Sequence, residues 1–111
     1  MIVALADVYA QIAHREAIQE VMVKTEARVR EDPGCVSFVF AEVLAEPGHF
    51  LLVQRWRDQA TLDEHYRSAA FTDYQAGMRG LLVRDSEITV HVSEQEFRPV
   101  DSSRLDIGQD D

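Results

Sequence analysis

The stretch 32–71 constrains the fold most, because it contains a helix stop, two strand patterns and a second helix pattern in close succession. Strand patterns at 35–44 and 49–57 flank the turn sequence Glu46-Pro47-Gly48. Proline followed by glycine is the order that a type II turn favours. The stretch therefore predicts an antiparallel hairpin followed by a helix that carries His65.

The remaining patterns place one strand and one helix before this hairpin, and a helix and a strand after it. A short apolar run at 2–9 predicts a strand, and apolar residues at helical steps over 14–31 predict an amphipathic helix. Ser68 can cap a further short helix over 69–80, and alternation resumes at 86–93. The order is that of the split βαβ arrangement, so we expect an α+β, ferredoxin-like fold with an antiparallel sheet.

The first strand of the hairpin is largely apolar on both faces. Alternation assigns one face to Val36, Phe38, Phe40 and Leu44. It assigns the other to Val39, Ala41 and Val43. A sheet with helices on one face still needs a cover for a second apolar face, so we expect a homodimer that forms a dimeric α+β barrel. In the last strand we expect Ile88, Val90 and Val92 on the inner side.

Length and charge limit the domain count and the partners. A chain of 111 residues that is 46% hydrophobic is enough for one domain, which we place at 1–93. The acidic segment 94–111 is expected to be a tail, partly disordered or packed on the partner subunit. A net charge of −9 argues against nucleic acid and membrane surfaces as partners. Without a long apolar run or a basic leader in the sequence, we expect a cytoplasmic protein.

Motifs for metal or phosphate chemistry are missing from the sequence. The four histidines lack metal-ligand spacing, the single cysteine cannot form a zinc cluster, and no glycine-rich phosphate loop occurs. What remains is a set of aromatic and titratable residues that the fold could gather between sheet and helices: Asp7, Phe38, Phe40, Trp56, His65, Phe71 and Tyr74. A pocket of this composition suits a flat aromatic molecule.

Each member of this set also has a plain structural interpretation. Trp56 and the phenylalanines are more often core residues than ligand contacts, and Tyr74 can be a core residue with a solvated hydroxyl. Asp7 either points to water near the end of its strand or faces a polar pocket, since an unpaired buried carboxylate is costly. We expect His65 near the boundary of the buried region, where an ordinary pKa of about 6.5 lets it accept a proton.

The segments EDPGCVSFVF, PGHFLLVQRW and LDEHYRSAAF within 31–71 resemble the antibiotic biosynthesis monooxygenase domain. This group of dimeric α+β barrels includes quinol monooxygenases. The resemblance covers about residues 1–93 and implies two sheets packed face to face, with a pocket in each subunit between sheet and helices. Several members oxidise phenols or quinols with molecular oxygen and without metal or flavin, so the resemblance implies no cofactor. Trp56 and His65 match the tryptophan and the first helix histidine of the family motif.

The resemblance therefore implies a monooxygenase acting on a small phenolic or quinol-type aromatic. In this interpretation His65, aided by Asp7, helps to form the substrate anion. The pocket is expected to be shaped by Trp56, Phe40, Phe38, Phe71 and Tyr74.

Other functions stay open at this point. Ala70 stands where many relatives have a second histidine, which favours a dimeric module that binds or senses a small ligand without turnover. An isomerase acting on a small phosphorylated or carbonyl compound is a third possibility. Haem-degrading relatives have an axial histidine at the position of Gln75, and because glutamine is a poor iron ligand we predict no haem degradation.

Overall fold

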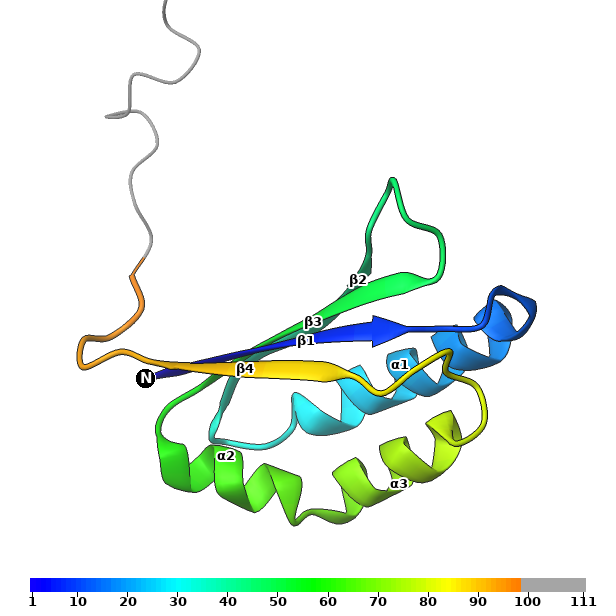
Figure 1. Cartoon of the computed structure of the whole chain (residues 1–111). Helices are drawn as coiled ribbons and strands as arrows, with labels where there is room; N and C mark the ends of the chain where they lie inside the picture. The colour runs from blue at the N-terminus through cyan, green and yellow to red at the C-terminus, as the bar shows by residue number, and fades with distance from the viewer. Residues whose placement is uncertain (99–111) are drawn as a thin grey trace, which may run out of the picture.

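In the computed structural model, which describes residues 1–98, the chain forms a four-stranded antiparallel sheet. The strands are β1 (Ile2–Tyr9), β2 (Cys35–Glu42), β3 (His49–Trp56) and β4 (Glu87–Val92), in the spatial order β2-β3-β1-β4. This order and the antiparallel pairing confirm the predicted α+β, ferredoxin-like fold (Figure 1). Most of the predicted tail, residues 99–111, lies outside the described residues.

The helices all lie on one face of this sheet (Figure 1). They are α1 (Arg15–Val29), preceded by the 3₁₀ turn η1 (Ile12–His14), then α2 (Gln59–Tyr66) and α3 (Ala69–Met78). Their bounds agree with the sequence patterns to within a few residues. Within the described part of the chain, no helix has the length and apolar character that crossing a bilayer requires.

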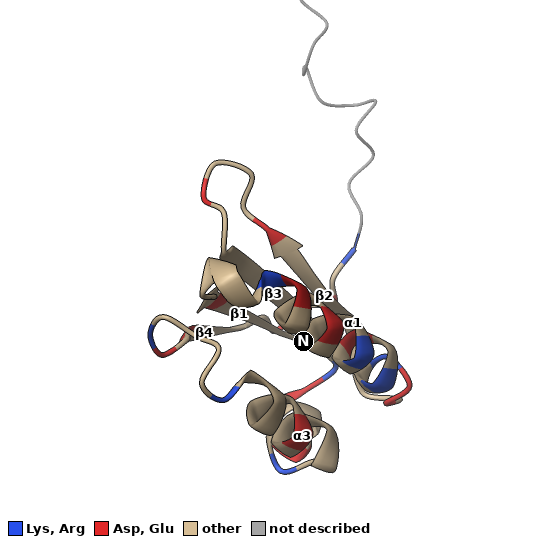
Figure 2. Ribbon diagram, turned by 90° about the vertical axis from the view of Figure 1, so that its right-hand side faces the viewer, with Lys and Arg blue, Asp and Glu red and all other residues tan. Residues whose placement is uncertain are grey.

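Helix α1 packs on the sheet through one stripe of its surface. Ile18, Met22, Thr25 and Val29 are buried, at the steps of three and four that place them on one face. Acidic and basic residues both occur along the rest of the helix (Figure 2). The amphipathic helix predicted from this pattern is therefore present.

Short polar interactions set the turns and helix starts. The Asp58 carboxylate accepts a hydrogen bond from the Thr61 amide at 2.9 Å and so begins α2. Ser68 begins α3 in the same way through the Phe71 amide. In the hairpin, Gly48 has a φ of +86°, a conformation that disfavours any residue with a Cβ, as the predicted turn requires.

The core lies between the helices and the inner face of the sheet. Every second residue of β1 is buried there, beginning at Ile2, and the alanines at positions 4 and 6 allow close approach of the helices. Trp56 from β3 and Leu62 from α2 are completely buried in the same cluster.

The prediction that Val36, Phe38, Phe40 and Leu44 share one face of the strand is wrong at two positions. Val36 is 47% exposed and Leu44 is 100% exposed. A register shift between Cys35 and Ser37 adds one residue to β2, which breaks the alternation at Val36. Leu44 lies beyond the end of the strand at Glu42.

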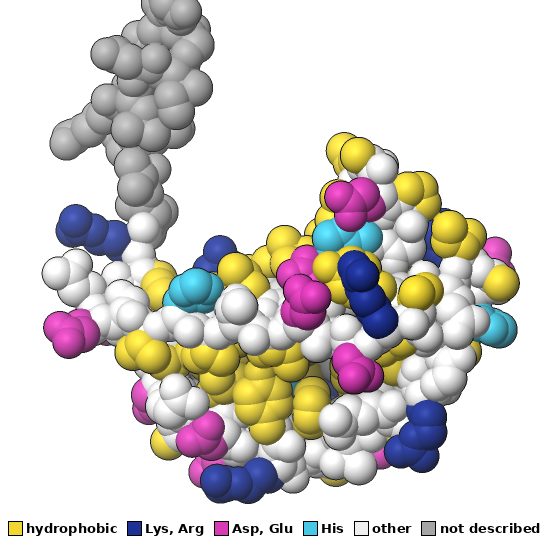
Figure 3. Space-filling view, viewed as in Figure 1, with side chains coloured by type: hydrophobic (Ala, Val, Ile, Leu, Met, Phe, Trp, Pro, Cys, Tyr) yellow, Lys and Arg dark blue, Asp and Glu magenta, His cyan; other side chains and the backbone are white. Residues whose placement is uncertain are grey.

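The apolar residues of β4 lie on the predicted face but are not covered. Val90 pairs with Ala4, and Ile88 pairs with Ala6, so both share the side of the sheet that faces the helices. They are nevertheless 44% and 49% exposed, and Val92 is 72% exposed. Figure 3 shows the resulting band of hydrophobic side chains below this strand. The space that the helices leave beneath β4 opens into the cavity described below.

Within residues 1–98, no helix covers the opposite face of the sheet, which we call the outer face (Figure 1). Its centre consists of the half-buried apolar side chains of Val3, Leu5, Leu51 and Val53. Such a face is consistent with the expected homodimer, which stays a prediction for a single chain.

Candidate functional site

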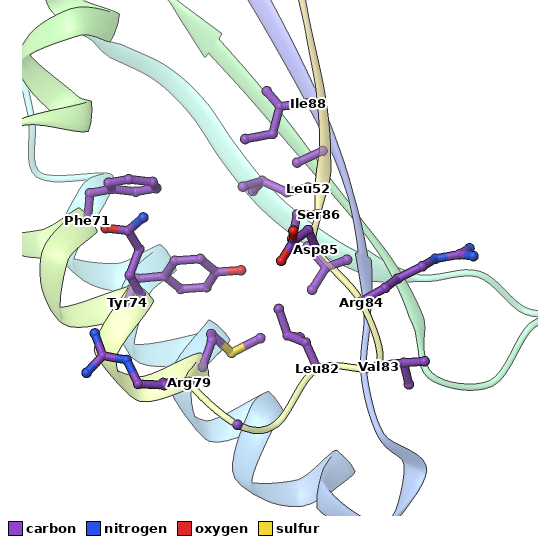
Figure 4. A pocket seen from close by; sticks show the side chains of 15 residues that line it. Leu52, Phe71, Tyr74, Arg79, Leu82, Val83, Arg84, Asp85, Ser86 and Ile88 are labelled. Carbon is purple, nitrogen blue, oxygen red and sulfur yellow. The ribbon is translucent and has the colours of Figure 1, made fainter.

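A cavity of about 680 Å³ lies between α3, the inner face of the sheet and the connection 79–86 that leads into β4 (Figure 4). Its walls are mainly apolar, with Ala6, Val8, Leu52, Phe71, Met78 and Leu82 among the lining residues. Polar groups come from Tyr74 and Gln75 on α3 and from Asp85 and Ser86 just before β4. This size and composition are typical of a site for a small organic molecule.

Tyr74 is a polar group of the cavity whose ring is packed against two other aromatic rings. Its ring stacks against Phe40 at 5.7 Å and against Phe71 at 6.3 Å between ring centroids. Its hydroxyl points across the cavity toward Asp85 and Ser86 (Figure 4). Burial raises the pKa of Tyr74 to about 12, so the hydroxyl is protonated at neutral pH and can donate a hydrogen bond.

The opposite wall is tied to the end of β1. The Val83 amide donates to the Tyr9 carbonyl at 2.8 Å, and the Gln11 amide donates to the Leu81 carbonyl at 2.9 Å. The Arg84 guanidinium lies 3.7 Å from the centre of the Tyr9 ring, in a cation–π contact. These contacts hold the residues just before Asp85 against the sheet.

His65 does not reach this cavity. The side chain is 3% exposed, so the expectation of a boundary position is wrong. Its ring lies 4.8 Å from Trp56, 5.6 Å from Phe38 and 5.5 Å from Phe71. Burial lowers the pKa of His65, which keeps the imidazole neutral at pH 7. Because α2 lies directly on the Trp56 cluster, the histidine became part of the core.

Asp7 lies on the outer face of the sheet, away from His65 and the cavity. Its neighbours Ala6 and Val8 line the cavity, and side chains alternate along a strand, so Asp7 must point the other way. Its carboxylate binds the His49 imidazole, with Oδ1 2.7 Å from Nε2. The expectation that the fold brings Asp7 and His65 together is wrong.

The expected aromatic set is divided between the core and the cavity. Trp56 is fully buried, and its Nε1 donates to Gln54 at 3.0 Å, while Phe38 is 2% exposed. Phe40 packs on the core and supports Tyr74 from behind. Of the seven expected site residues, Phe71 and Tyr74 line the cavity.

Asp85 and Ser86 are lining residues that sequence reasoning missed. They lie in a connection without helical or strand periodicity, where no pattern reports which way a side chain points. Asp85 stands directly before the strand predicted at 86–93, and Ser86 is the first residue of that prediction. This was the available signal, because residues at the ends of scaffold elements often take part in binding.

A second polar cluster lies on the outer face around His49. Its Nε2 contacts Asp7, its Nδ1 lies 2.6 Å from a Glu46 oxygen, and its ring stacks on Tyr9 at 4.7 Å. The hydrogen bond to Asp7 raises the pKa of His49, and Glu46 adds to the effect. Across residues 1–98, no three His, Cys, Asp or Glu side chains are grouped so that they could hold a metal ion.

Sequence comparison links the chain to known proteins. Residues 1–77 match the profile of the family described as Antibiotic biosynthesis monooxygenase. A Synechocystis protein named "Uncharacterized protein sll1783" is 34% identical over 62 residues, which are 56% of this chain and 42% of that protein. The Mycobacterium tuberculosis protein named "Putative monooxygenase Rv0793" is 32% identical over 76 residues, which are 68% of this chain and 74% of that protein. The chain thus spans less than half of the Synechocystis protein.

Solved structures agree with this assignment. The structure of Rv0793 superposes with a TM-score of 0.78 at 26% identity, covering 86% of this chain and 96% of the other. A Deinococcus radiodurans protein described as a "putative antibiotic biosynthesis monooxygenase" gives 0.82 at 22% identity, covering 91% and 100%, and supports the fold alone. The family profile covers well over half of the sequence and confirms the resemblance seen in 31–71. The chain belongs to the antibiotic biosynthesis monooxygenase family.

Proposed function

We propose that the chain is a cofactor-independent monooxygenase that oxidises a small phenolic or quinol-type aromatic with molecular oxygen. Family membership supports a monooxygenase-type function. The observation that carries the proposal is the cavity of about 680 Å³ between α3 and β4, which has apolar walls and a few polar groups. It can hold a flat aromatic molecule of two or three fused rings.

In the proposed reaction the substrate supplies all the electrons. In an anthrone-type phenol, a ring CH₂ group is converted to a carbonyl, one oxygen atom of O₂ enters the product, and the other leaves as water with the two hydrogens of the CH₂ group. In a hydroquinone, one ring C–H becomes C–OH while the ring is oxidised to the quinone, and the second oxygen atom again leaves as water. The apolar walls orient the ring and exclude water, and the Tyr74 hydroxyl can stabilise negative charge that develops on a substrate oxygen.

His65 is given a positioning role in this proposal, in place of direct proton transfer. It is neutral and buried, and it contacts Phe71, which lines the cavity. Trp56 and Phe38 surround the same imidazole, so the aromatic cluster fixes one wall of the cavity from behind.

Oxygen uptake by two matched variants tests the location and the reaction. Ile88→Trp places an indole at the cavity lining, whereas Val92→Trp makes the same change on the same face of β4 beyond the cavity. We expect wild type and Val92→Trp to consume oxygen with hydroxylated anthrones or hydroquinones above the non-enzymatic rate. Ile88→Trp should lose most of this activity. Absence of uptake above background across such a panel would exclude the proposed reaction.

The second candidate is a non-catalytic module that binds or senses a small apolar ligand. Ala70, at the position of a family histidine, favours it, as does the fact that His65 is not among the residues lining the cavity. The same variants separate the two functions. A binding module retains ligand affinity in Val92→Trp, loses it in Ile88→Trp, and consumes no oxygen in either protein.

We also propose that the outer face pairs with a second copy of the chain. Val3, Leu5, Leu51 and Val53 form an apolar centre there that no element of residues 1–98 covers. Leu51→Asp should convert a dimer to a monomer in analytical ultracentrifugation, because it places a charge in this centre. Val23→Asp, at a 63% exposed position on α1, is the control. A wild-type monomer at micromolar concentration would contradict this proposal.

A further inference from the structure

The two walls of the cavity present opposite hydrogen-bonding groups. On α3, the Tyr74 hydroxyl is a donor held in place by the Phe40 and Phe71 rings. On the other wall, Asp85 contributes a carboxylate, which can only accept hydrogen bonds when ionised. Figure 4 shows the tyrosine hydroxyl pointing across the cavity toward this residue.

The position of Asp85 is fixed from both sides along the chain. Before it, the Val83 amide is bonded to Tyr9 and the Arg84 side chain lies on the Tyr9 ring. After it, Glu87 begins β4 and pairs with Asp7 of β1. The backbone is thus held on both sides of Asp85, and its exposed side chain belongs to the cavity lining, where a ligand group can reach it.

Among residues 1–98, the basic side chains that line the cavity do not compete for Asp85 inside it. The side chains of Arg79 and Arg84 both belong to the lining, but Figure 4 shows them pointing away from the space between Tyr74 and Asp85. An anionic ligand group next to the carboxylate would be repelled, whereas a neutral hydroxyl can donate to it.

We propose that Asp85 and Tyr74 select the ligand as an acceptor and donor pair: Asp85 accepts a hydrogen bond from a ligand hydroxyl, and Tyr74 donates one to a carbonyl of the same flat ring system. The proposal rests on the proposed function for the choice of cavity, and it concerns binding rather than turnover. The ligand class is a neutral, fused-ring hydroxyketone.

Three probes with one ring system separate the two interactions: fluorenone, a hydroxyfluorene and a hydroxyfluorenone. Titration calorimetry measures their affinities for wild type, Asp85→Ala and Tyr74→Phe. Asp85→Ala should weaken the two hydroxyl-bearing probes about tenfold and leave fluorenone within about twofold, since a hydrogen bond to a charged group contributes about 1.5 kcal/mol or more. Tyr74→Phe should weaken the two carbonyl-bearing probes about fivefold and spare the hydroxyfluorene.

Matched controls remove the corresponding group elsewhere. Glu87→Ala deletes a carboxylate two residues from Asp85, on the outer face, and Tyr66→Phe deletes a tyrosine hydroxyl that does not line the cavity. Neither should change any of the affinities by more than about twofold. Asp85→Asn, which keeps the shape and one acceptor oxygen, should show an intermediate loss for the hydroxyl-bearing probes.

The proposal is overturned if Asp85→Ala weakens the binding of all three probes equally or of none of them. It is also overturned if Tyr74→Phe weakens the carbonyl-bearing probes no more than the hydroxyfluorene, or if the wild type does not bind the hydroxyfluorenone. These outcomes are independent of oxygen uptake. If the variants show the selective affinities but the protein consumes no oxygen, the proposed reaction is excluded and the roles of Asp85 and Tyr74 in binding stand. If the protein consumes oxygen but the affinities are not selective, the proposed reaction stands and these binding roles are excluded.

Discussion

The Glu26 carboxylate of α1 accepts a hydrogen bond from the backbone amide of Phe40, 2.7 Å away on the free edge of β2. One turn later, at the C-cap of the same helix, Arg30 donates to the Phe38 carbonyl at 3.1 Å. The two side chains also form an ion pair, with 3.7 Å between nitrogen and oxygen. Together they occupy two of the backbone groups with which an edge strand could otherwise pair with another chain.

Glu26→Ala should therefore lower the free energy of unfolding by about 1–2 kcal/mol, because the Phe40 amide loses its partner in a half-buried position. Urea unfolding measures this loss. Glu20→Ala, on the exposed side of α1, breaks only a surface pair with Lys24 and should cost about 0.5 kcal/mol or less. An equal effect of both changes would show that the strand-edge contact contributes nothing specific.

Glu42 should make stability depend on pH in the acid range. The hydrogen bond from Arg15, followed by that from the Gly48 amide, lowers the pKa of Glu42 from 4.5 to about 2. Since the folded state holds the ionised form, this stabilisation is present above about pH 4.5 and is lost as the pH falls toward 2. Glu42→Gln should reduce the change of the urea unfolding midpoint with pH between about 4.5 and 2. Glu20→Gln, the matched control at an exposed position, should leave this pH dependence as it is in the wild type.

His49 should act in the opposite direction. The hydrogen bond to Asp7, with a smaller effect of Glu46, raises the pKa of His49 above its ordinary value of 6.5. The resulting stabilisation is complete below pH 6.5 and is lost as the pH rises through the folded-state pKa. Asp7→Asn should move the NMR titration of His49 to lower pH. It should also reduce the loss of folding stability that accompanies rising pH. An unchanged His49 titration in Asp7→Asn would mean that the contact is absent in solution.

His65→Ala should be strongly destabilising, since it removes a ring from the Trp56 and Phe71 cluster. Truncating a buried aromatic side chain typically costs about 3 kcal/mol or more. Thermal and urea unfolding measure the loss, and His91→Ala, at an exposed position of β4, is the matched control. If His65→Ala left stability intact but abolished oxygen uptake, His65 would be a catalytic group rather than a positioning one.

The elements of the fold were predictable because their signals are local. The turn at Gly48, the caps at Asp58 and Ser68, and the helical spacing from Ile18 to Val29 each depend on residues within one or two turns of one another. The errors arose where distant elements decide the outcome. Val36 fell on the wrong face because of a bulge that depends on pairing with β3.

The candidate site was less predictable for the same reason. Tyr74 and Phe71 were identified because an aromatic pair at helical spacing must face either the core or a cavity. His65 was misplaced because its burial depends on how α2 packs on Trp56 and Phe38. Asp85 was missed because its direction depends on the contacts of its neighbours with Tyr9.

The sequence alone determined the order of strands and helices, the turn of the hairpin and the family, because periodicity, capping and motif spacing are properties of short segments. The tertiary structure alone decided which face of β1 the helices cover, and hence that Asp7 lies opposite the cavity. It also decided that β4 stays uncovered and that Asp85 faces Tyr74 across the resulting space. These outcomes depend on packing between segments far apart in the chain, where a side chain's surroundings come from elements that no local pattern describes.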